Sequence, residues 1–214
     1  MLESADIAAI VLAAGTSSRF GSDKLLYPVT LHGVTLPLAA HSLLPWLEIC
    51  AQVSVVVRPE AEMFCSKIEA ALGINRSAQI RWVVCGNAAQ GMAASLLCGV
   101  RANPDAAGWL IGLADMPAVP ASAIAGVRNA LKTGANLAAP LCDGRRGHPV
   151  GFAFSYRDEL LALKGDTGAR RLLERDAVVG IRINDNGIFA DIDMPGDVQS
   201  LCVLSDECVS DEPG

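Results

Sequence analysis

A loop rich in small residues follows the first apolar run of the chain and carries two cations. The segment LAAGTSSRFGSDK, residues 12–24, contains Gly15, Ser17, Arg19 and Lys24. Small residues allow backbone N–H groups to approach an anion closely, and Arg and Lys can then bind its oxygens through charge-assisted hydrogen bonds. The segment therefore predicts a phosphate-binding loop. The alternative is a solvated strand–helix connection with two surface cations.

Two familiar phosphate-binding loops do not fit this segment. A Walker A loop has the pattern G-x-x-x-x-G-K-[ST], whereas Gly21 is followed here by Ser22. The dinucleotide fingerprint G-x-G-x-x-G is also absent, because Thr16 and Ser17 follow Gly15. A nicotinamide-dependent dehydrogenase is therefore disfavoured.

Candidate metal ligands follow two later apolar segments. Asp115 comes after the run Trp109–Leu113, and ligands in open α/β sheets bind at the carboxyl ends of strands. Asp191 and Asp193 flank one apolar residue, so an extended chain points both side chains the same way. Mg²⁺ is often held by one or two carboxylates and substrate phosphates, so Asp115 and Asp193 are predicted metal ligands. In both places the alternative is a helix N-cap, since a proline follows two residues later.

Two basic clusters lie in the second half of the chain. They are Arg145, Arg146 and His148 in a turn, and Arg170 and Arg171 at the start of a late helical segment. Arginine clusters suit the phosphate or carboxylate of a small ligand, so both are candidates for binding a second substrate. The alternatives are a solvated basic turn or helix face, and a structural turn histidine.

Short apolar runs alternate with amphipathic segments along the chain. Strands are expected at 7–14, 53–57, 80–84, 109–113, 137–140 and 150–154, and helices at 36–49, 61–72, 92–100, 122–131 and 168–173. Continuous apolar runs are typical of strands that are buried on both faces of a parallel sheet. The alternation predicts a layered α/β fold with right-handed crossovers.

The chain is expected to form one domain over residues 1–204. Its first part, about 6–117, is the expected nucleotide-binding half, and about 118–204 the smaller substrate-binding half. Asn186-Gly187 predicts a hairpin or tight turn. Residues 205–214 are acidic and aperiodic, which predicts a flexible tail.

Composition narrows the possible partners. The 214 residues carry a net charge of −6, so nucleic acid and anionic membrane surfaces are not expected partners. Aromatic residues make up only 5%, which leaves few platforms for stacking bases. Arginine outnumbers lysine 13 to 4, which favours a small phosphorylated ligand.

Cysteine usage and the N-terminal region predict a cytoplasmic protein. The seven cysteines are an odd number without a CxxC pair, which indicates free thiols in a reducing compartment. The first apolar run, 7–14, is much shorter than the roughly 20 residues that span a bilayer. No basic segment precedes it, as a signal peptide would require.

The loop segment leads to a family resemblance. Residues 12–24 match the signature L-A-[AG]-G-x-S-x-R-x-G-x-x-K of the MobA-like nucleotidyltransferases. Within these, the chain most resembles the molybdenum cofactor cytidylyltransferases. The further matching segments, in order, are GMAASL (91–96), LADMP (113–117), GHPVGF (147–152), DTGAR (166–170) and DIDMP (191–195). The resemblance covers about residues 6–204.

The resemblance implies a Rossmann-like nucleotidyltransferase fold, a three-layer α/β/α arrangement around a mostly parallel, mixed sheet of seven strands. It implies Mg²⁺-dependent transfer of a nucleoside monophosphate from a nucleoside triphosphate to the phosphate of molybdopterin, with release of pyrophosphate. A molybdenum hydroxylase is the implied recipient of the product.

The resemblance also implies residue roles. Leu12, Ala13 and Ala14 would contact base and ribose through main-chain atoms, and Arg19 and Lys24 would hold the triphosphate. Arg19, Lys24 and Asp115 are the implied catalytic residues, with Asp115 and Asp193 binding the metal. The full nucleotide-binding set is Leu12, Ala13, Ala14, Gly15, Ser17, Arg19, Lys24, Gly91, Met92, Ser95 and Asp115, and the candidate acceptor-binding set is Arg145, Arg146, His148 and Arg170.

One residue bears on the choice of nucleotide. Guanylyltransferases of this family carry L-A-G-G and cytidylyltransferases L-A-A-G, so Ala14 implies CTP. The Gly91-Met92 segment also resembles the cytidylyl branch. The stretch 85–90 before it is shorter than is usual in the family.

Three alternatives stay open at this point. The first is a guanylyltransferase, and the second is another nucleotidyltransferase of the same superfamily. Isoprenoid-pathway cytidylyltransferases usually carry V-H-D-x-A-R-P, whereas this chain has no His before Asp115 and no Arg before Pro117. The third is a non-catalytic cofactor carrier that docks on a molybdoenzyme through the acidic tail.

Overall fold

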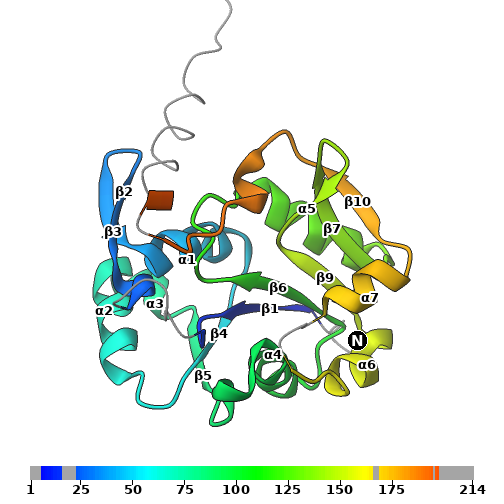
Figure 1. Cartoon of the computed structure of the whole chain (residues 1–214), viewed down its shortest axis with the longest axis horizontal. Helices are drawn as coiled ribbons and strands as arrows, with labels where there is room; N and C mark the ends of the chain where they lie inside the picture. The colour runs from blue at the N-terminus through cyan, green and yellow to red at the C-terminus, as the bar shows by residue number, and fades with distance from the viewer. Residues whose placement is uncertain (1–5, 16–22, 166–168, 195, 198–214) are drawn as a thin grey trace, which may run out of the picture.

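The computed structural model describes residues 6–15, 23–165, 169–194 and 196–197. A twisted central sheet lies between two layers of helices, with α1 and α5 on one face and α4 and α6 on the other (Figure 1). The predicted three-layer α/β/α fold is confirmed. Ser17, Arg19 and the acidic segment 205–214 lie outside the described residues.

The main sheet has eight strands. Seven follow the order β10-β7-β9-β6-β1-β4-β5, and the two-residue β8 pairs with β7 at the side. Their bounds are β1 Ile7–Leu12, β4 Val53–Val57, β5 Ile80–Val84, β6 Gly108–Leu113, β7 Leu137–Cys142, β8 Arg145–Arg146, β9 Val150–Ala153 and β10 Val179–Arg182.

The sheet is mixed because one strand of the path runs backwards. β1 pairs in parallel with both β4 and β6, whereas β9 is antiparallel to β6 and to β7. In the β6–β9 pair Ile111 lies opposite Val150, so the start of β9 lies beside the carboxyl end of β6. Residues just before β9 therefore reach the same sheet edge as residues just after β6.

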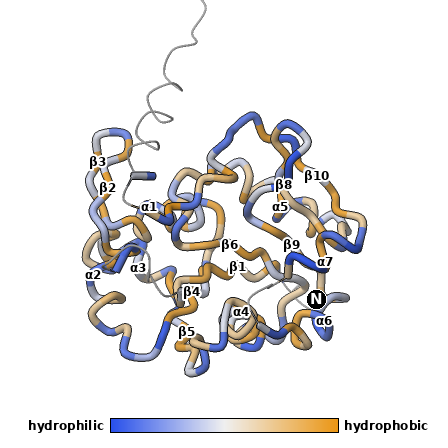
Figure 2. The backbone as a smooth tube through the Cα atoms, in the orientation of Figure 1, coloured by the Kyte–Doolittle hydropathy of each residue, from blue (hydrophilic) through white to orange (hydrophobic). Residues whose placement is uncertain are grey.

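The strands form because their residues are buried on both faces. All five residues of β4 are buried, and apolar side chains of β1 alternate between two cores. Ala9 and Val11 belong to the core under α1, α2 and α5, whereas Ile10 belongs to the core under α4. Figure 2 shows that hydrophobic residues predominate along the sheet and that hydrophilic residues predominate in the outer loops.

Seven α-helices connect the strands in the described part of the chain. They are α1 Leu38–Ile49, α2 Glu62–Leu72, α3 Ile74–Ser77, α4 Met92–Arg101, α5 Ala121–Lys132, α6 Arg157–Leu161 and α7 Arg170–Arg175. Short 3₁₀ turns are η1 Lys24–Leu26, η2 Ala88–Gln90, η3 Phe154–Tyr156 and η4 Asn186–Phe189. None of the described helices is long and apolar enough to cross a bilayer.

Several elements differ from the sequence-based expectation. Strand β1 ends at Leu12 rather than at residue 14, which leaves Ala13 and Ala14 in the loop. The antiparallel pair β2 (Pro28–Leu31) and β3 (Val34–Pro37) was not expected, and it delays the start of α1 to Leu38. Its turn has positive φ at both His32 (50°) and Gly33 (76°), the backbone of a tight hairpin turn.

The Asn186-Gly187 pair forms a tight turn, not a hairpin. The side chain of Asp185 accepts a hydrogen bond from the Gly187 N–H at 2.7 Å, which starts the 3₁₀ turn η4. Because the Gly187 N–H is bound to the Asp185 side chain, it cannot donate to a neighbouring strand, and the chain forms a turn here.

Candidate functional site

The carboxyl ends of β1 and β6 place the two strongest sequence motifs side by side. Leu12 lies opposite Leu113 in the parallel pair, and the Ala114 N–H donates to the Leu12 carbonyl at 3.0 Å. The Ala13 N–H donates to the Val56 carbonyl at 2.8 Å, which fixes the start of the loop. Asp115 consequently leaves the sheet next to the small-residue loop.

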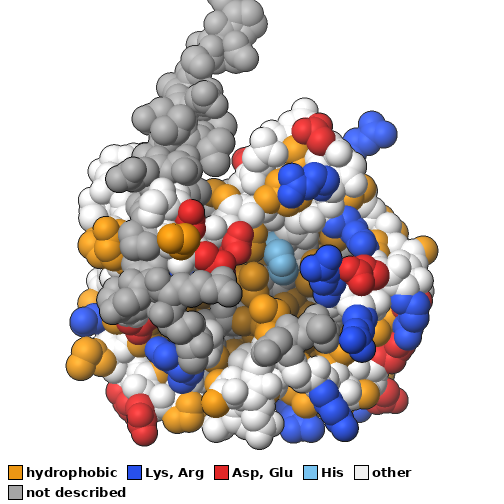
Figure 3. Space-filling view, in the orientation of Figure 1, with side chains coloured by type: hydrophobic (Ala, Val, Ile, Leu, Met, Phe, Trp, Pro, Cys, Tyr) orange, Lys and Arg blue, Asp and Glu red, His pale blue; other side chains and the backbone are white. Residues whose placement is uncertain are grey.

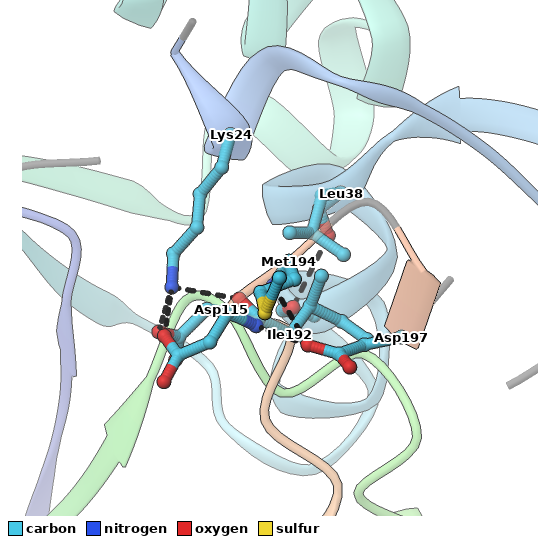
Figure 4. A network of polar contacts seen from close by, with 8 residues as sticks. Lys24, Leu38, Asp115, Ile192, Met194 and Asp197 are labelled. Carbon is cyan, nitrogen blue, oxygen red and sulfur yellow. Dashed lines mark hydrogen bonds and ion pairs between the residues drawn. The ribbon is translucent and has the colours of Figure 1, made fainter. Parts of the chain in front are cut away.

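Three segments that are distant in the sequence converge on one ammonium group. Lys24 Nζ donates to Asp115 Oδ2 at 2.9 Å and to Asp193 Oδ1 at 3.0 Å. It also donates to the Ile192 carbonyl at 2.7 Å (Figure 4). The Lys24 side chain is only 12% exposed, so these contacts are largely sheltered from water.

The segment that carries Asp193 is tied down by backbone hydrogen bonds. The Ile192 N–H donates to the Asp115 carbonyl at 3.0 Å, which joins the two acidic motifs directly. Asp197 Oδ2 accepts from the N–H groups of Asp193 at 2.9 Å and Met194 at 2.7 Å. The side chain of Asp197 thus caps this turn, while the side chain of Asp193 binds Lys24.

The N-cap alternative does not hold for Asp115. The next helix, α5, begins at Ala121 with Pro120 at its N-cap, several residues beyond Asp115. Asp115 Oδ1 is buried and has no hydrogen-bond partner among the described residues. A buried carboxylate oxygen without a partner is costly, so this atom is available to a ligand.

The charge of Lys24 is secured by its neighbours. Burial alone would lower the pKa of Lys24, but hydrogen bonds and charge from Asp115, and then from Asp193, outweigh burial and raise the pKa. Lys24 is therefore a permanent cation between two carboxylates at neutral pH.

A cavity of about 490 Å³, here called the loop cavity, opens beside this cluster. Nine of the eleven predicted nucleotide-binding residues line it: Leu12, Ala13, Ala14, Gly15, Lys24, Gly91, Met92, Ser95 and Asp115. The other two, Ser17 and Arg19, lie outside the described residues. Leu25, Ala88, Ala89 and Leu113 also line it and were missed, because apolar side chains carry no chemical signal.

Gly91 shapes one wall of the loop cavity. Its backbone has φ 108° and ψ −179°, a conformation that favours glycine, and it directly precedes α4. The ten-residue helix α4 therefore begins at the cavity, with Met92 and Ser95 on its lining. The positive end of a helix dipole favours an anion nearby.

A second cavity of about 800 Å³, here called the arginine cavity, adjoins the first. Leu12, Met92 and Leu113 line both cavities. All four predicted acceptor-binding residues, Arg145, Arg146, His148 and Arg170, line the arginine cavity. Its floor is apolar, from Leu96, Ile111, Val150 and Leu173. Figure 3 shows this hollow with a histidine at its edge, acidic side chains on one side and basic ones on the other.

Each arginine of this cavity has a different partner within the protein. The Arg145 guanidinium lies 4.5 Å from the centre of the Phe189 ring, a cation–π contact. Arg146 Nη1 donates to the Leu173 carbonyl, and Arg170 Nε donates to Glu174 at 2.7 Å. Arg171 is exposed and is not among the described residues that line either cavity, unlike its neighbour Arg170.

His148 combines a structural backbone with an unpaired ring. Its N–H donates to the Ile188 carbonyl at 2.9 Å, which anchors the turn before β9. Its Nδ1 is buried without a partner among the described residues. Burial lowers the pKa of His148, against the opposing charges of Asp115 and Asp191, so the ring is neutral at pH 7.

A separate cavity of about 350 Å³ lies at the opposite ends of the strands. Two arginines on its lining bridge structural elements: Arg81 binds Asn103 Oδ1 at 2.6 Å, and Arg128 binds the Ile49 carbonyl at 3.0 Å. We interpret this cavity as part of the scaffold.

Comparison with known proteins now places the chain in a family. The fold is that of an α/β protein in which a loop rich in small residues leaves the first strand beside a lysine–carboxylate cluster. Residues 9–179 match the sequence model of the MobA-like NTP transferase domain, and the chain belongs to this family of nucleotidyltransferases. No curated protein sequence matches the chain.

Solved structures share the fold. Rv0371c from Mycobacterium tuberculosis, in complex with manganese, is 23% identical, with 94% of this chain and 99% of that chain covered and a TM-score of 0.71. A 4-diphosphocytidyl-2C-methyl-D-erythritol synthase from Anaerococcus prevotii is 15% identical, with coverages of 93% and 97% and a TM-score of 0.67. Molybdopterin-guanine dinucleotide biosynthesis protein A from Archaeoglobus fulgidus is 20% identical, with coverages of 94% and 100% and a TM-score of 0.61.

Proposed function

We propose that this nucleotidyltransferase transfers CMP from CTP to the phosphate of a molybdopterin-type acceptor and releases pyrophosphate. One observation carries the proposal: two cavities of different chemistry meet beside the Lys24–Asp115 pair. The loop cavity suits a nucleotide, whereas the arginine cavity suits a phosphorylated, ring-bearing acceptor.

The nucleotide would enter the loop cavity with its triphosphate toward Lys24. The walls there are small residues whose backbone can approach phosphate and ribose closely. Lys24 is positioned to bind phosphate oxygens, and Arg19 of the same motif is proposed to join it. The preference for CTP rests on Ala14, which is buried on the cavity wall.

The carboxylates fit a divalent cation. Asp115 offers a buried oxygen without a partner among the described residues, and Asp193 approaches the same ammonium group. The described residues contain no group of three or more His, Cys, Asp or Glu that could hold a metal alone. Mg²⁺ suits this donor set, because it binds through one or two carboxylates together with substrate phosphates. When bound, it would supply neutralisation of phosphate charge.

The protein's own contribution is positioning and charge. An oxygen of the acceptor phosphate attacks the α-phosphorus of CTP, and the bond to pyrophosphate breaks in line with the new one. Lys24 and Arg19 stabilise the negative charge that develops on the phosphates. No protein nucleophile is required, because holding both substrates in line supplies much of the acceleration.

The acceptor would place its phosphate at the junction of the cavities and its ring over the apolar floor. Arg145, Arg146 and Arg170 would bind anionic groups, and the neutral His148 ring would offer a hydrogen bond. The volume of about 800 Å³ falls within the usual range for small-molecule sites. On this proposal, segment 6–117 binds the nucleotide, and the acceptor-binding arginines come from segment 118–204.

Calorimetry tests the nucleotide half of the proposal. CTP, GTP, ATP and UTP are titrated into the purified protein with and without Mg²⁺. We expect tight, Mg²⁺-dependent binding of CTP alone. Preference for GTP would contradict the role of Ala14 and indicate guanylyl transfer.

Pyrophosphate release tests the acceptor half. With CTP present, release is compared for molybdopterin, methylerythritol phosphate and a hexose phosphate. We expect release with molybdopterin only. Release with either other acceptor would contradict the proposal, and stoichiometric binding without release would favour the carrier alternative.

A further inference from the structure

Two thiols meet behind the wall of the loop cavity. Cys85 directly follows β5, and its N–H donates to the Val57 carbonyl at 2.8 Å. Cys98 lies on α4, and its Sγ is 2.8 Å from Cys85 Sγ. Both residues are free cysteines. The sulfur atoms of a disulfide are about 2.05 Å apart, so only a small adjustment separates this pair from a covalent bond.

The segment between these cysteines forms part of the cavity wall. It contains the 3₁₀ turn Ala88–Gln90, and Ala88, Ala89, Gly91 and Met92 line the loop cavity. Asn87 Oδ1 lies 3.2 Å from Cys85 Sγ and 3.7 Å from Cys98 Sγ. The Cys85 thiol therefore donates to Asn87 at the base of this turn, while the Cys98 thiol donates to Cys85.

We propose that Cys85 and Cys98 are a redox-sensitive modification site, which forms an intramolecular disulfide and thereby weakens nucleotide binding in the loop cavity. Cys98 is half-buried and is reached first from solvent, whereas Cys85 is fully buried. The proposed oxidant is a small-molecule disulfide.

The reaction is a two-step thiol–disulfide exchange. The Cys98 thiolate attacks one sulfur of the small-molecule disulfide, forms a mixed disulfide and releases one small thiol. Cys85, after losing its proton, attacks the Cys98 sulfur and releases the second small thiol. The protein pair loses two electrons and two protons, and the small disulfide is reduced to two thiols.

The environment of the pair makes oxidation slow near neutral pH. Burial, followed by the hydrogen bond and charge of Cys85, raises the pKa of Cys98 to about 12. Since the thiolate is the attacking species, the rate rises with pH. The pair therefore stays reduced in a reducing compartment and responds to sustained oxidation.

Oxidation changes what holds the turn. A disulfide has no S–H groups, so Asn87 loses the hydrogen bond from the Cys85 thiol, while its contact with Gln90 at 3.5 Å is weak. The cavity wall at Ala88 and Ala89 is then less well held. We expect the KM for the nucleotide to rise roughly 5-fold, the size of one modest hydrogen bond. This consequence rests on the proposed function.

Mass spectrometry tests the site without any nucleotide. The full chain is equilibrated at mildly alkaline pH with glutathione at increasing ratios of oxidised to reduced form, alkylated and digested with trypsin. Peptide 82–101 contains Cys85 and Cys98 and no other cysteine. We expect a form of this peptide that lacks two hydrogen atoms and resists alkylation, and that increases with the ratio.

Two variants sharpen this test. Cys98→Ser should abolish the oxidised peptide, whereas Cys65→Ser, at another half-buried thiol, should leave it unchanged. Full alkylation of both cysteines at every ratio would overturn the proposal. A glutathione adduct on Cys98 without the internal disulfide would overturn it as well.

Kinetics test the functional consequence separately. KM for CTP is measured on the reduced protein, the oxidised protein and the oxidised protein after dithiothreitol. We expect a reversible rise in the wild type and none in Cys98→Ser. A disulfide that forms without changing KM would overturn the link to nucleotide binding. If CTP is not the substrate, the peptide result still decides the site.

Discussion

Lys24 and Asp115 form an ion pair at 2.9 Å that joins the loop after β1 to the loop after β6. Asp193 completes the cluster from a third segment. The single ammonium group thus pairs with two carboxylates, and the cluster keeps a net negative charge. On the proposed function, a triphosphate would compete with those carboxylates for Lys24, and a divalent cation would take its place beside them.

The first prediction concerns Asp115. Replacing it by Ala removes the proposed metal ligand and the partner of Lys24, so we expect at least about 10²-fold lower turnover, the size of one lost electrostatic stabiliser. Pyrophosphate release under saturating substrates measures it. Asp158→Ala is the control, because its side chain is 94% exposed and pairs only loosely with Arg157 at 3.5 Å. Near-normal turnover of Asp115→Ala would refute the assignment.

The second prediction follows from the raised pKa of Lys24. A group whose pKa is raised on folding stabilises the native state fully below its unfolded pKa, about 10.4 for Lys, and loses this contribution as pH rises through the folded value. Lys24→Met should therefore lower the free energy of unfolding at pH 8, and the difference from wild type should shrink above pH 10.5. Urea denaturation of both proteins at pH 8 and above pH 10.5 measures the difference in the free energy of unfolding. A difference that is independent of pH would contradict the ion-pair account.

The third prediction concerns the choice of base. Ala14→Gly removes one methyl group from the wall of the loop cavity, so we expect the ratio of kcat/KM for CTP over GTP to fall roughly 10-fold. Ala13→Gly removes the same group from the neighbouring buried residue and serves as the matched control. Equal ratios in the two variants would show that Ala14 does not select the base.

The fourth prediction separates the two cavities. Arg146→Ala should raise the KM for the acceptor roughly 10-fold, as expected for a lost charge-assisted hydrogen bond, and leave the KM for CTP unchanged. Arg171→Ala is the matched control, since this exposed arginine is not among the described residues that line either cavity. A parallel rise in both KM values for Arg146→Ala would contradict separate binding sites.

The fifth prediction tests the packing behind the site. A Cβ added at Gly112 of β6 would overlap the Trp46 ring at Cζ2. Trp46 belongs to α1 and is buried. We expect Gly112→Ala to destabilise the fold by about 1–3 kcal/mol in urea denaturation. Gly86→Ala, where an added Cβ has no neighbour within 4 Å, should be nearly neutral. Equal stabilities would show that the ring can move aside.

The sequence predicted strands best where they are buried. In Val53–Val57, for example, four of the five residues are apolar and all five are buried, because both faces of the strand are covered. Strand β10 was missed because it lies at the sheet edge, with Val179 47% exposed. The β2–β3 pair was missed because β2 alternates between exposed and buried residues, β3 has no buried residue, and both short strands stand outside the main sheet.

The site was predicted where charged or small motif residues follow a strand. Asp115 was found because its position after a buried run has a general meaning in α/β sheets. Asp193 was also predicted as a metal ligand, but its pairing with Lys24 needed the fold, since only tertiary structure brings the two residues together. Ala88 and Ala89 shape the loop cavity through their backbone path, which side-chain chemistry does not reveal.

Because strand β9 is antiparallel to its neighbours, one sheet edge carries both residues that follow strands and residues that precede one. Lys24 and Asp115 follow parallel strands, whereas Arg145, Arg146 and His148 precede β9. Three of the four proposed acceptor-binding residues thus sit on an incoming connection, whereas Lys24 and Asp115 sit on outgoing loops. If the proposed function holds, exchange of segment 143–149 would alter acceptor choice while the proposed nucleotide site keeps its own residues.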